Sequence, residues 1–123
     1  MMSRRRIPCA AGTFYPADPE KLRSTVTSLT PSQTTPDPAW AVVVPHAGYQ
    51  FSGALAADVL SRVVVPDTCI LLGPNHTGMG APYSVWNKGS WEIPFGDVPV
   101  DEDLVEQILD TIPGMEADAS AHR

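Results

Sequence analysis

Two short apolar runs constrain the fold of this chain more than any other feature. Residues 41–44 and 69–72 are apolar at every position, without the alternation typical of a strand that has one face in water. An uninterrupted run of this kind is typical of a strand covered on both faces of a parallel sheet. The runs lie about thirty residues apart, the length of one strand–helix–strand unit. We therefore predict that residues 40–44 and 68–72 are neighbouring parallel strands joined by a right-handed crossover.

Three segments carry the signals that begin a helix. Asp18 is placed as an N-cap before Pro19, and Pro31 ends this first helix. Ser52 is placed to cap a helix between the two predicted strands, and Asp101 to cap a third helix. Each segment has an apolar stripe at helical spacing. The inward positions are Leu22, Val26 and Leu29, then Leu55, Val59, Leu60 and Val63, and finally Leu104, Val105, Ile108 and Leu109.

The remaining segments have weaker patterns. Residues 83–93 predict a hairpin or a strand with an excursion, and residues 94–100 an extended loop or edge strand. Residues 113–123 lack periodicity, and we expect them to be mostly coil, with His122 in a frayed tail without a function. The three arginines at positions 4–6 are expected to form a solvated tail.

The predicted fold class is α/β, with a parallel or mixed sheet and helices on both faces. Only two strands are of the fully buried type, whereas a sheet averages about five or six strands. The helices and aromatic residues therefore have too little partner surface. We infer that residues 1–123 are the N-terminal portion of a single larger α/β domain, or that the chain depends on association to cover its sheet.

The composition excludes several classes of function. The chain has 123 residues, enough for one domain, and is 43% hydrophobic and 18% charged, as expected for a globular protein. Its formal net charge of -6, with only 8 Lys+Arg, argues against nucleic acid as a partner. No apolar run approaches the roughly 20 residues needed to cross a bilayer, and no secretory signal peptide is recognisable. We expect a cytoplasmic protein without nucleic-acid or membrane partners.

A histidine follows each predicted strand. His46 comes after Pro45, and His76 after Asn75, both in loops that contain glycine. Neighbouring parallel strands lie about 4.8 Å apart and metal–imidazole bonds measure about 2.1 Å, so two such loops could bring both rings to one cation. We predict His46 and His76 as metal ligands and as the catalytic residues. Zinc or non-heme iron would need further ligands. The alternative is that each histidine only stabilises its loop through a hydrogen bond.

Two neighbours of the histidines are predicted to bind substrate. Tyr49 could donate its phenol proton in the pocket, or it could be an ordinary packed tyrosine. Asn75 could orient the following histidine or bind a substrate oxygen, or it could shape the turn. Phe14 and Tyr15 are expected to pack. A phosphate-binding loop and a serine nucleophile elbow are both lacking, which argues against nucleotide hydrolysis and serine hydrolysis.

Four motifs, in order along the chain, resemble one known family. They are AGTFYP at residues 11–16, PHAGYQFSG at 45–53, GPNHTG at 73–78 and WEIPFGDVPVD at 91–101. Each motif is short, but four in this order make a specific signal. Together they resemble the Memo family, called AmmeMemoRadiSam system protein B in bacteria and archaea, over nearly the whole chain.

The resemblance implies a fold akin to that of the class III extradiol dioxygenases, the LigB-like fold. It also implies that His46 and His76 line a pocket for iron or copper, completed by a histidine or cysteine far downstream, outside residues 1–123. The implied function is a redox or dioxygenase-related reaction on an unknown substrate, with radical-SAM and AMMECR-like proteins as partners. Memo-family chains are much longer than this one, so the sequence leaves open whether this chain is itself an enzyme.

Two other functions stay open from the sequence. The same pocket could belong to a non-catalytic binding module or adaptor that recognises an anionic ligand, such as a phosphate, a carboxylate or a peptide that carries one. His46, Asn75 and His76 would then donate hydrogen bonds to the anion. The chain could also be a gene fragment without a function of its own.

Overall fold

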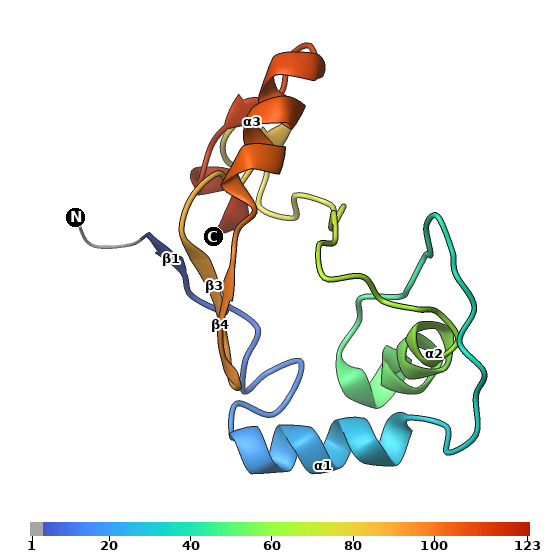
Figure 1. Ribbon diagram of the computed structural model, residues 1–123. Coiled ribbons are helices and arrows are strands. Elements are labelled where there is room, and N and C mark those ends of the chain that lie inside the picture. The colour runs from blue at the N-terminus through green and yellow to red at the C-terminus, as the bar shows by residue number, and fades with distance from the viewer. Residues whose placement is uncertain (1–3) are drawn as a thin grey trace. The chain divides into compact units, whose positions relative to one another are not determined.

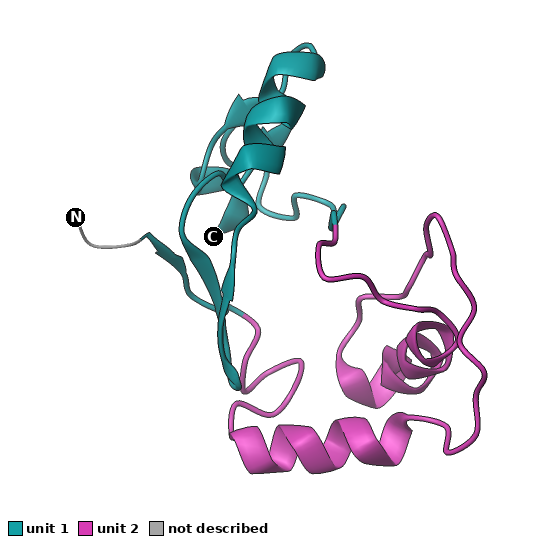
Figure 2. Ribbon diagram, in the orientation of Figure 1, with its two compact units in different colours: residues 1–9, 70–123 teal, residues 10–69 magenta. Residues whose placement is uncertain are grey.

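The computed structural model describes residues 4–123, which form two compact units (Figures 1 and 2). Unit 1 contains residues 4–9 and Ile70–Arg123, and unit 2 contains Ala10–Cys69. The described residues form three α-helices, a three-stranded mixed sheet and a two-stranded parallel sheet. The predicted α/β class is therefore confirmed.

Helix α1 of unit 2 spans Pro19–Leu29, as its cap predicts. The side chain of Asp18 accepts a hydrogen bond from the backbone N–H of Lys21 at 2.8 Å. A cap of this kind stabilises a helix by about 1 kcal/mol. The helix ends at Thr30, whose backbone N–H and hydroxyl both donate to the carbonyl oxygen of Val26.

Helix α2 spans Tyr49–Ser61 and begins earlier than predicted. Its N-cap is Gly48, so Ser52, the predicted cap, lies inside the helix. The backbone N–H of Ser52 already bonds the carbonyl oxygen of Gly48 at 3.1 Å, which makes it part of the first turn. The Ser52 hydroxyl donates to the carbonyl oxygen of Ala47 at 2.8 Å. The prediction that Ser52 caps the helix was therefore wrong, because the Ser52 hydroxyl donates to the backbone before the helix and does not accept a hydrogen bond from the helix N–H groups.

The two helices of unit 2 pack against each other through a glycine. Gly53 of α2 is buried and faces Leu29 of α1. A Cβ atom at Gly53 would lie 2.8 Å from Leu29 Cδ1, closer than such atoms pack. Leu22 is buried on α1. The close contact fixes the beginning of α2, and with it the loop that precedes the helix.

The two apolar runs do not form the predicted strands. Residues 40–44 and 68–72 are irregular, and no strand of the described residues pairs with either. Val43 is 92% exposed and Leu72 94% exposed, so neither run is buried. A β-strand forms only where a neighbouring strand pairs with its N–H and C=O groups. Within residues 4–123 the prediction of two neighbouring strands was therefore wrong. An apolar pattern indicates that a segment suits a buried sheet, but it does not show that a partner strand lies beside it.

The larger sheet of unit 1 has the strand order β1-β3-β4. Strand β1 is Arg5–Arg6, β3 is Ser90–Ile93 and β4 is Gly96–Pro99. β1 runs parallel to β3, whereas β3 and β4 form an antiparallel hairpin in which Trp91 lies opposite Val98. The hairpin therefore lies one strand later than predicted.

The N-terminal arginines belong to this sheet and do not form a solvated tail. The Arg4 guanidinium lies 4.8 Å from the centroid of the Trp86 ring, and that of Arg6 lies 4.3 Å from the centroid of Trp91. Contacts of this kind between a cation and an aromatic face contribute about 0.5–1 kcal/mol each at exposed sites. The carboxylates that pair with Arg5 are Asp97 at 2.8 Å and Glu92 at 3.0 Å.

Helix α3 of unit 1 spans Glu102–Thr111 and begins where the sequence predicts. The side chain of Asp101 accepts a hydrogen bond from the backbone N–H of Leu104 at 3.0 Å. Val105 is buried on its inner side. None of the helices in the described part of the chain has the length and apolarity needed to cross a membrane.

The segment after α3 has regular structure, where the sequence predicts coil. Strand β5, Glu116–Ala117, pairs in parallel with β2, Ser84–Val85, and a 3₁₀ turn spans Ser120–His122. The Asp118 carboxylate accepts a hydrogen bond from the backbone N–H of Ala81 at 2.8 Å. Most of residues 113–123 are turn or coil, as predicted, and the prediction missed the two short elements because their contacts join residues far apart in sequence.

Candidate functional site

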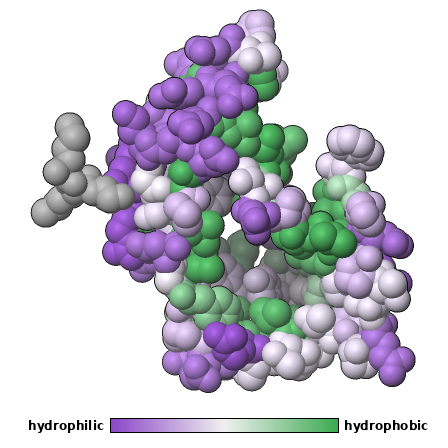
Figure 3. Space-filling view, in the orientation of Figure 1, coloured by the Kyte–Doolittle hydropathy of each residue, from purple (hydrophilic) through white to green (hydrophobic). Residues whose placement is uncertain are grey.

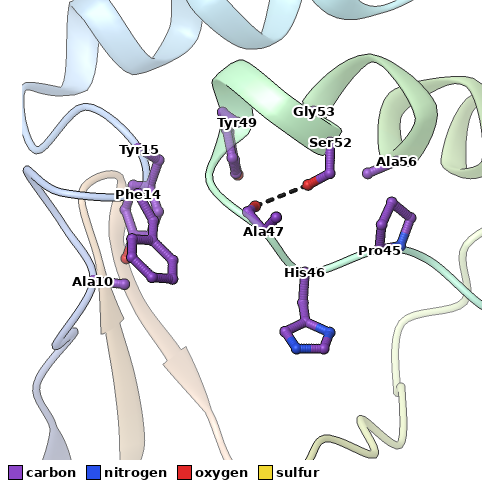
Figure 4. A pocket seen from close by; sticks show the side chains of 10 residues that line it. All are labelled: Ala10, Phe14, Tyr15, Pro45, His46, Ala47, Tyr49, Ser52, Gly53 and Ala56. Atoms are coloured by element: carbon purple, nitrogen blue, oxygen red, sulfur yellow. Dashed lines mark hydrogen bonds between the residues drawn. The ribbon is translucent and has the colours of Figure 1, made fainter.

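His46 stands at the edge of a cavity in unit 2 (Figure 4). The residue follows Pro45 and precedes the N-cap of α2, and its exposed ring points away from that helix. The cavity has a volume of about 250 Å³. The residues that line it come from the loop before α1 and from the beginning of α2: Ala10, Phe14, Tyr15, Pro45, His46, Ala47, Tyr49, Ser52, Gly53 and Ala56.

Two motifs that are far apart in sequence meet at this cavity. The backbone N–H of Tyr49 donates to the carbonyl oxygen of Phe14 at 2.8 Å. The rings of Tyr15 and Tyr49 also pack, with centroids 5.6 Å apart. The histidine loop and the loop of residues 10–16 are therefore held together by a backbone hydrogen bond and by an aromatic contact.

The loop of residues 10–16 forms a tight turn that supplies one wall of the cavity. The backbone N–H of Gly12 bonds the carbonyl oxygen of Tyr15 at 2.8 Å, and that of Phe14 bonds the carbonyl oxygen of Ala10 at 2.9 Å. Gly12 adopts a φ of 83°, which glycine reaches without a steric penalty. The sequence predicted that Phe14 and Tyr15 pack, and it missed that they line the same cavity as His46. The available signal was a glycine two positions before a pair of aromatic residues.

Ser52 anchors the histidine loop from inside α2. Its side chain is only 9% exposed, and its hydroxyl donates to Ala47, the residue directly after His46. The first turn of the helix therefore holds the backbone on one side of the histidine. An intramolecular hydrogen bond of this kind contributes about 0.5–1.5 kcal/mol.

The wall of the cavity is mostly apolar. None of its ten lining residues is Asp, Glu, Lys or Arg, and its titratable side chains are His46, Tyr15 and Tyr49. An imidazole can ligate a metal or exchange a proton, and a phenol can donate a hydrogen bond. A phosphate or carboxylate gains most from a cationic partner, and this wall has no lysine or arginine. Tyr49 does line the cavity, while its role in substrate binding stays a prediction.

Asn75 organises the turn that carries His76 in unit 1. Its side-chain oxygen accepts hydrogen bonds from the N–H and hydroxyl of Thr77, at 3.1 and 2.9 Å, and from the N–H of Gly78 at 3.1 Å. Its amide group donates to the carbonyl oxygen of Met79 at 2.7 Å. Both ends of the Asn75 amide are therefore used within the turn, which is the structural role that the sequence left open beside substrate binding.

The two predicted metal ligands belong to different units. His46 lies in unit 2 and His76 in unit 1, and both residues are exposed. Their convergence on one ion therefore stays a prediction. Within residues 4–123, no three side chains of His, Cys, Asp or Glu gather in a way that could hold a metal ion.

His122 is the third histidine, and it is not in a frayed tail. Its Nε2 lies 3.4 Å from the Ser84 hydroxyl oxygen, and its ring meets Trp86 edge to face at 6.3 Å. Burial lowers the pKa of His122, and the nearby Arg6 guanidinium lowers it further, while Ser84 and Asp118 act in the opposite direction. The sequence missed this half-buried histidine because Arg6, Ser84 and Trp86, which surround it, lie far from it in sequence.

Comparison with known proteins then identifies the family. A family model described as Memo-like protein matches residues 6–123, including both histidine loops and the cavity wall. This chain belongs to the Memo-like family. The resemblance seen in the four motifs is therefore confirmed for almost every residue of the chain.

Curated relatives of this Memo-like chain come from bacteria and archaea. A MEMO1 family protein of Aquifex aeolicus is 43% identical over 122 residues, a match that covers 97% of this chain and 45% of the relative. A MEMO1 family protein of Sulfolobus acidocaldarius is 40% identical, with 95% of this chain and 47% of the relative covered. One from Methanopyrus kandleri is 38% identical, covering 95% and 46%. The Memo-like chain thus spans less than half the length of these relatives.

Proposed function

We propose that this Memo-like chain contributes His46 and His76 to a pocket that holds an iron or copper ion. The complete pocket would carry out a redox or dioxygenase-related reaction on a substrate that is not yet known. The observation that carries the proposal is the position of His46, whose exposed ring stands at the edge of a cavity built from two family motifs.

The donor set of this chain fits the proposed metal in part. Imidazole nitrogen is a suitable ligand for both iron and copper. Two histidines leave at least one further protein ligand to be supplied by residues other than those described here, and the relatives contain more than twice the length that this chain matches. Bound iron or copper would supply one-electron redox chemistry or Lewis-acid activation.

The residues of this chain have distinct proposed roles in that pocket. Ser52 holds the backbone beside His46, and Asn75 holds the turn that carries His76. Tyr49 would donate a hydrogen bond to the substrate from the cavity wall, and the apolar side chain of Phe14 would exclude water from it. Asn75 is also a candidate to contact substrate, once its turn opens.

The proposal includes the fold and the partners that the family resemblance implies. In the proposed LigB-like fold, both histidine loops would open at the same edge of the sheet. Radical-SAM and AMMECR-like proteins are the proposed partner classes. The anion-binding module is the less favoured alternative because the cavity wall has no lysine or arginine.

Anaerobic metal titration tests the proposed function. Fe(II) and copper would be titrated separately into the wild-type chain and into His46→Ala and His76→Ala, with affinity measured by calorimetry. We expect each substitution to weaken binding by about 10–100-fold or more, since each removes a ligand. His122→Gln is the matched control, because it removes the third histidine and should leave the affinity unchanged. The same substitutions in the Aquifex aeolicus relative, at the histidines that align with His46 and His76, test the complete pocket, and equal affinity in its wild type and variants would overturn the proposal.

A further inference from the structure

The segment that carries His76 enters the packed part of unit 1 at its C-terminal end. Residues 70–80, which we call the His76 segment, are exposed along their whole length. Leu72 is 94% exposed, and the space-filling view shows apolar side chains at the surface of unit 1 (Figure 3). Ala81, the next residue after the segment, is buried. The contacts made at Gly80 and Ala81 therefore determine how the His76 segment joins unit 1.

The Asp118 carboxylate holds this end of the segment and also holds its own turn. Its Oδ2 accepts a hydrogen bond from the backbone N–H of Ala81 at 2.8 Å. Its Oδ1 accepts the backbone N–H of Ser120 at 2.8 Å and the Ser120 hydroxyl. These bonds lower the pKa of Asp118, those with Ser120 most, so the group is ionised and both oxygens act as acceptors at neutral pH. One side chain thus joins residues 118–120 to the end of the His76 segment.

Gly80 makes a second contact with the same turn. A Cβ atom at Gly80 would lie 2.5 Å from Asp118 Oδ2 and 2.7 Å from Ser120 Oγ, closer than such atoms pack. The backbone of Gly80 therefore lies directly against residues 118–120. This close approach is independent of the hydrogen bond to Ala81, and both observations place the same two residues on the Asp118 turn.

The part of the segment that carries His76 is closed on itself. The Asn75 amide donates to the carbonyl oxygen of Met79 at 2.7 Å and accepts the N–H of Gly78 at 3.1 Å. Residues 75–79 therefore form one unit, and the direction of that unit depends on the backbone of Gly80, where it meets the Asp118 turn. A change at Gly80 would carry His76 with it.

We propose that Asp118 is a positioning residue for His76. By holding Gly80 and Ala81, it fixes the direction of the turn and thus the point at which the His76 imidazole can meet a metal ion. The inference rests on the proposed function, in which His76 is a metal ligand. Asp118 acts through His76 and is not itself a ligand, since both of its oxygens already accept hydrogen bonds. Groups that orient a metal ligand typically change affinity by about 10–100-fold.

Asp118→Asn tests the link to Ala81 selectively. Asparagine has nearly the same shape but one acceptor oxygen in place of two, so it cannot serve both Ser120 and Ala81. We expect amide exchange at residues 77–81 to quicken by at least about 10-fold, and the NMR signals of the His76 ring to shift. Fe(II) affinity should fall by about 10-fold. Ser120→Ala is the matched control, because it removes the hydroxyl bond and leaves the bond to Ala81, and it should leave the His76 signals unchanged.

Gly80→Ala tests the same contact from the other side and covers the case in which Asp118→Asn does not fold. Its Cβ should push the segment off the Asp118 turn and shift the His76 ring signals. Gly114→Ala is its control, since the φ values are 78° and 81° but a Cβ at Gly114 meets no atom within 4 Å. Asp101→Ala, which removes the cap of α3, controls for lower stability alone and should leave the His76 signals in place.

Two results would overturn the inference. One is that the His76 ring signals stay unchanged in both Asp118→Asn and Gly80→Ala. The other is that they shift equally in the control variants. The ring signals need no metal, so they decide this inference even where the chain binds Fe(II) too weakly to measure. The metal titration that tests the proposed function is therefore a separate result.

Discussion

The hydroxyl group of Ser52 donates a hydrogen bond to the carbonyl oxygen of Ala47 at 2.8 Å. Because Ala47 directly follows His46, this bond connects the first turn of α2 to the proposed metal ligand. Ser52 is almost fully buried, whereas His46 is exposed. The exposed imidazole of His46 thus stands next to a segment of backbone that a buried side chain holds.

Ser52→Ala should lower the free energy of unfolding by about 0.5–1.5 kcal/mol, because the Ala47 carbonyl loses its side-chain donor. Urea unfolding followed by circular dichroism measures the change. The control is Ser61→Ala, in the same helix, where the hydroxyl bonds the carbonyl oxygen of Asp58 one turn earlier. Hydrogen exchange should quicken at residues 47–49 in the first variant and not in the second. Equal exchange in both would show that Ser52 does not hold the histidine loop.

Gly89→Ala should destabilise unit 1 by more than about 2 kcal/mol. Gly89 has a φ of 80°, and a Cβ atom there would overlap the carbonyl group of Arg4, which accepts the backbone N–H of Ser90. The substitution should therefore detach β1 from β3. Gly114→Ala is the matched control, since its φ is 81° and its Cβ would meet no atom within 4 Å. Its cost should stay near 1 kcal/mol, and thermal unfolding of the two variants isolates the effect of the overlap.

Asn75 variants test which atoms of its amide hold the turn that carries His76. Asn75→Ala removes the hydrogen bonds that the Asn75 side chain makes with Thr77, Gly78 and Met79, so amide exchange at residues 77–79 should quicken and metal affinity should fall by about 10-fold. Asn75→Asp keeps the acceptor for Thr77 and Gly78 and loses only the donor to Met79. It should retain most of the affinity. An Asp variant as weak as the Ala variant would contradict the assignment of the turn to the Asn75 side-chain oxygen.

Stability should fall as the pH drops below the ordinary pKa of histidine, and His122 should be responsible. Folding lowers the pKa of His122, mainly through burial and also through Arg6, so the unfolded chain binds a proton first. The stabilising contribution is complete above about pH 6.5 and is lost as the pH falls through the lowered pKa of the folded state. Urea unfolding at several values between pH 7.5 and 5 measures this loss.

The matching variant for the pH experiment is His122→Gln, which should flatten the dependence in this range. Folding also lowers the pKa of Asp118, mainly through its hydrogen bond with Ser120. That contribution is present above the ordinary carboxylate pKa and is lost only at more acidic pH, outside the measured window. An unchanged slope in His122→Gln would contradict the assignment.

Local signals predicted the helices well. At Asp18 and Asp101, the capping side chain and the backbone N–H that it accepts are only three residues apart. Both partners therefore lie within one short stretch of sequence, where a pattern can reveal them. The cap at Ser52 was wrong by one helical turn because a glycine before a helix is a weaker signal than a polar side chain inside it. Of the residues that line the cavity, the sequence predicted a pocket role only for His46 and Tyr49. The loop of residues 10–16 reaches the cavity through a backbone hydrogen bond between Tyr49 and Phe14, which side-chain patterns do not reveal.

The sequence by itself determined the α/β class, the start of two helices and the family, because caps, apolar periodicity and motifs are properties of neighbouring residues. Tertiary structure decided what the strands pair with. It placed Arg5 and Arg6 beside Ser90 and Trp91, and it left residues 40–44 without a partner strand in the described chain. A strand forms only when it pairs with a second strand, which is often distant in sequence. An apolar pattern therefore indicates that one segment suits a buried sheet, whereas the tertiary structure decides whether a partner strand lies beside it.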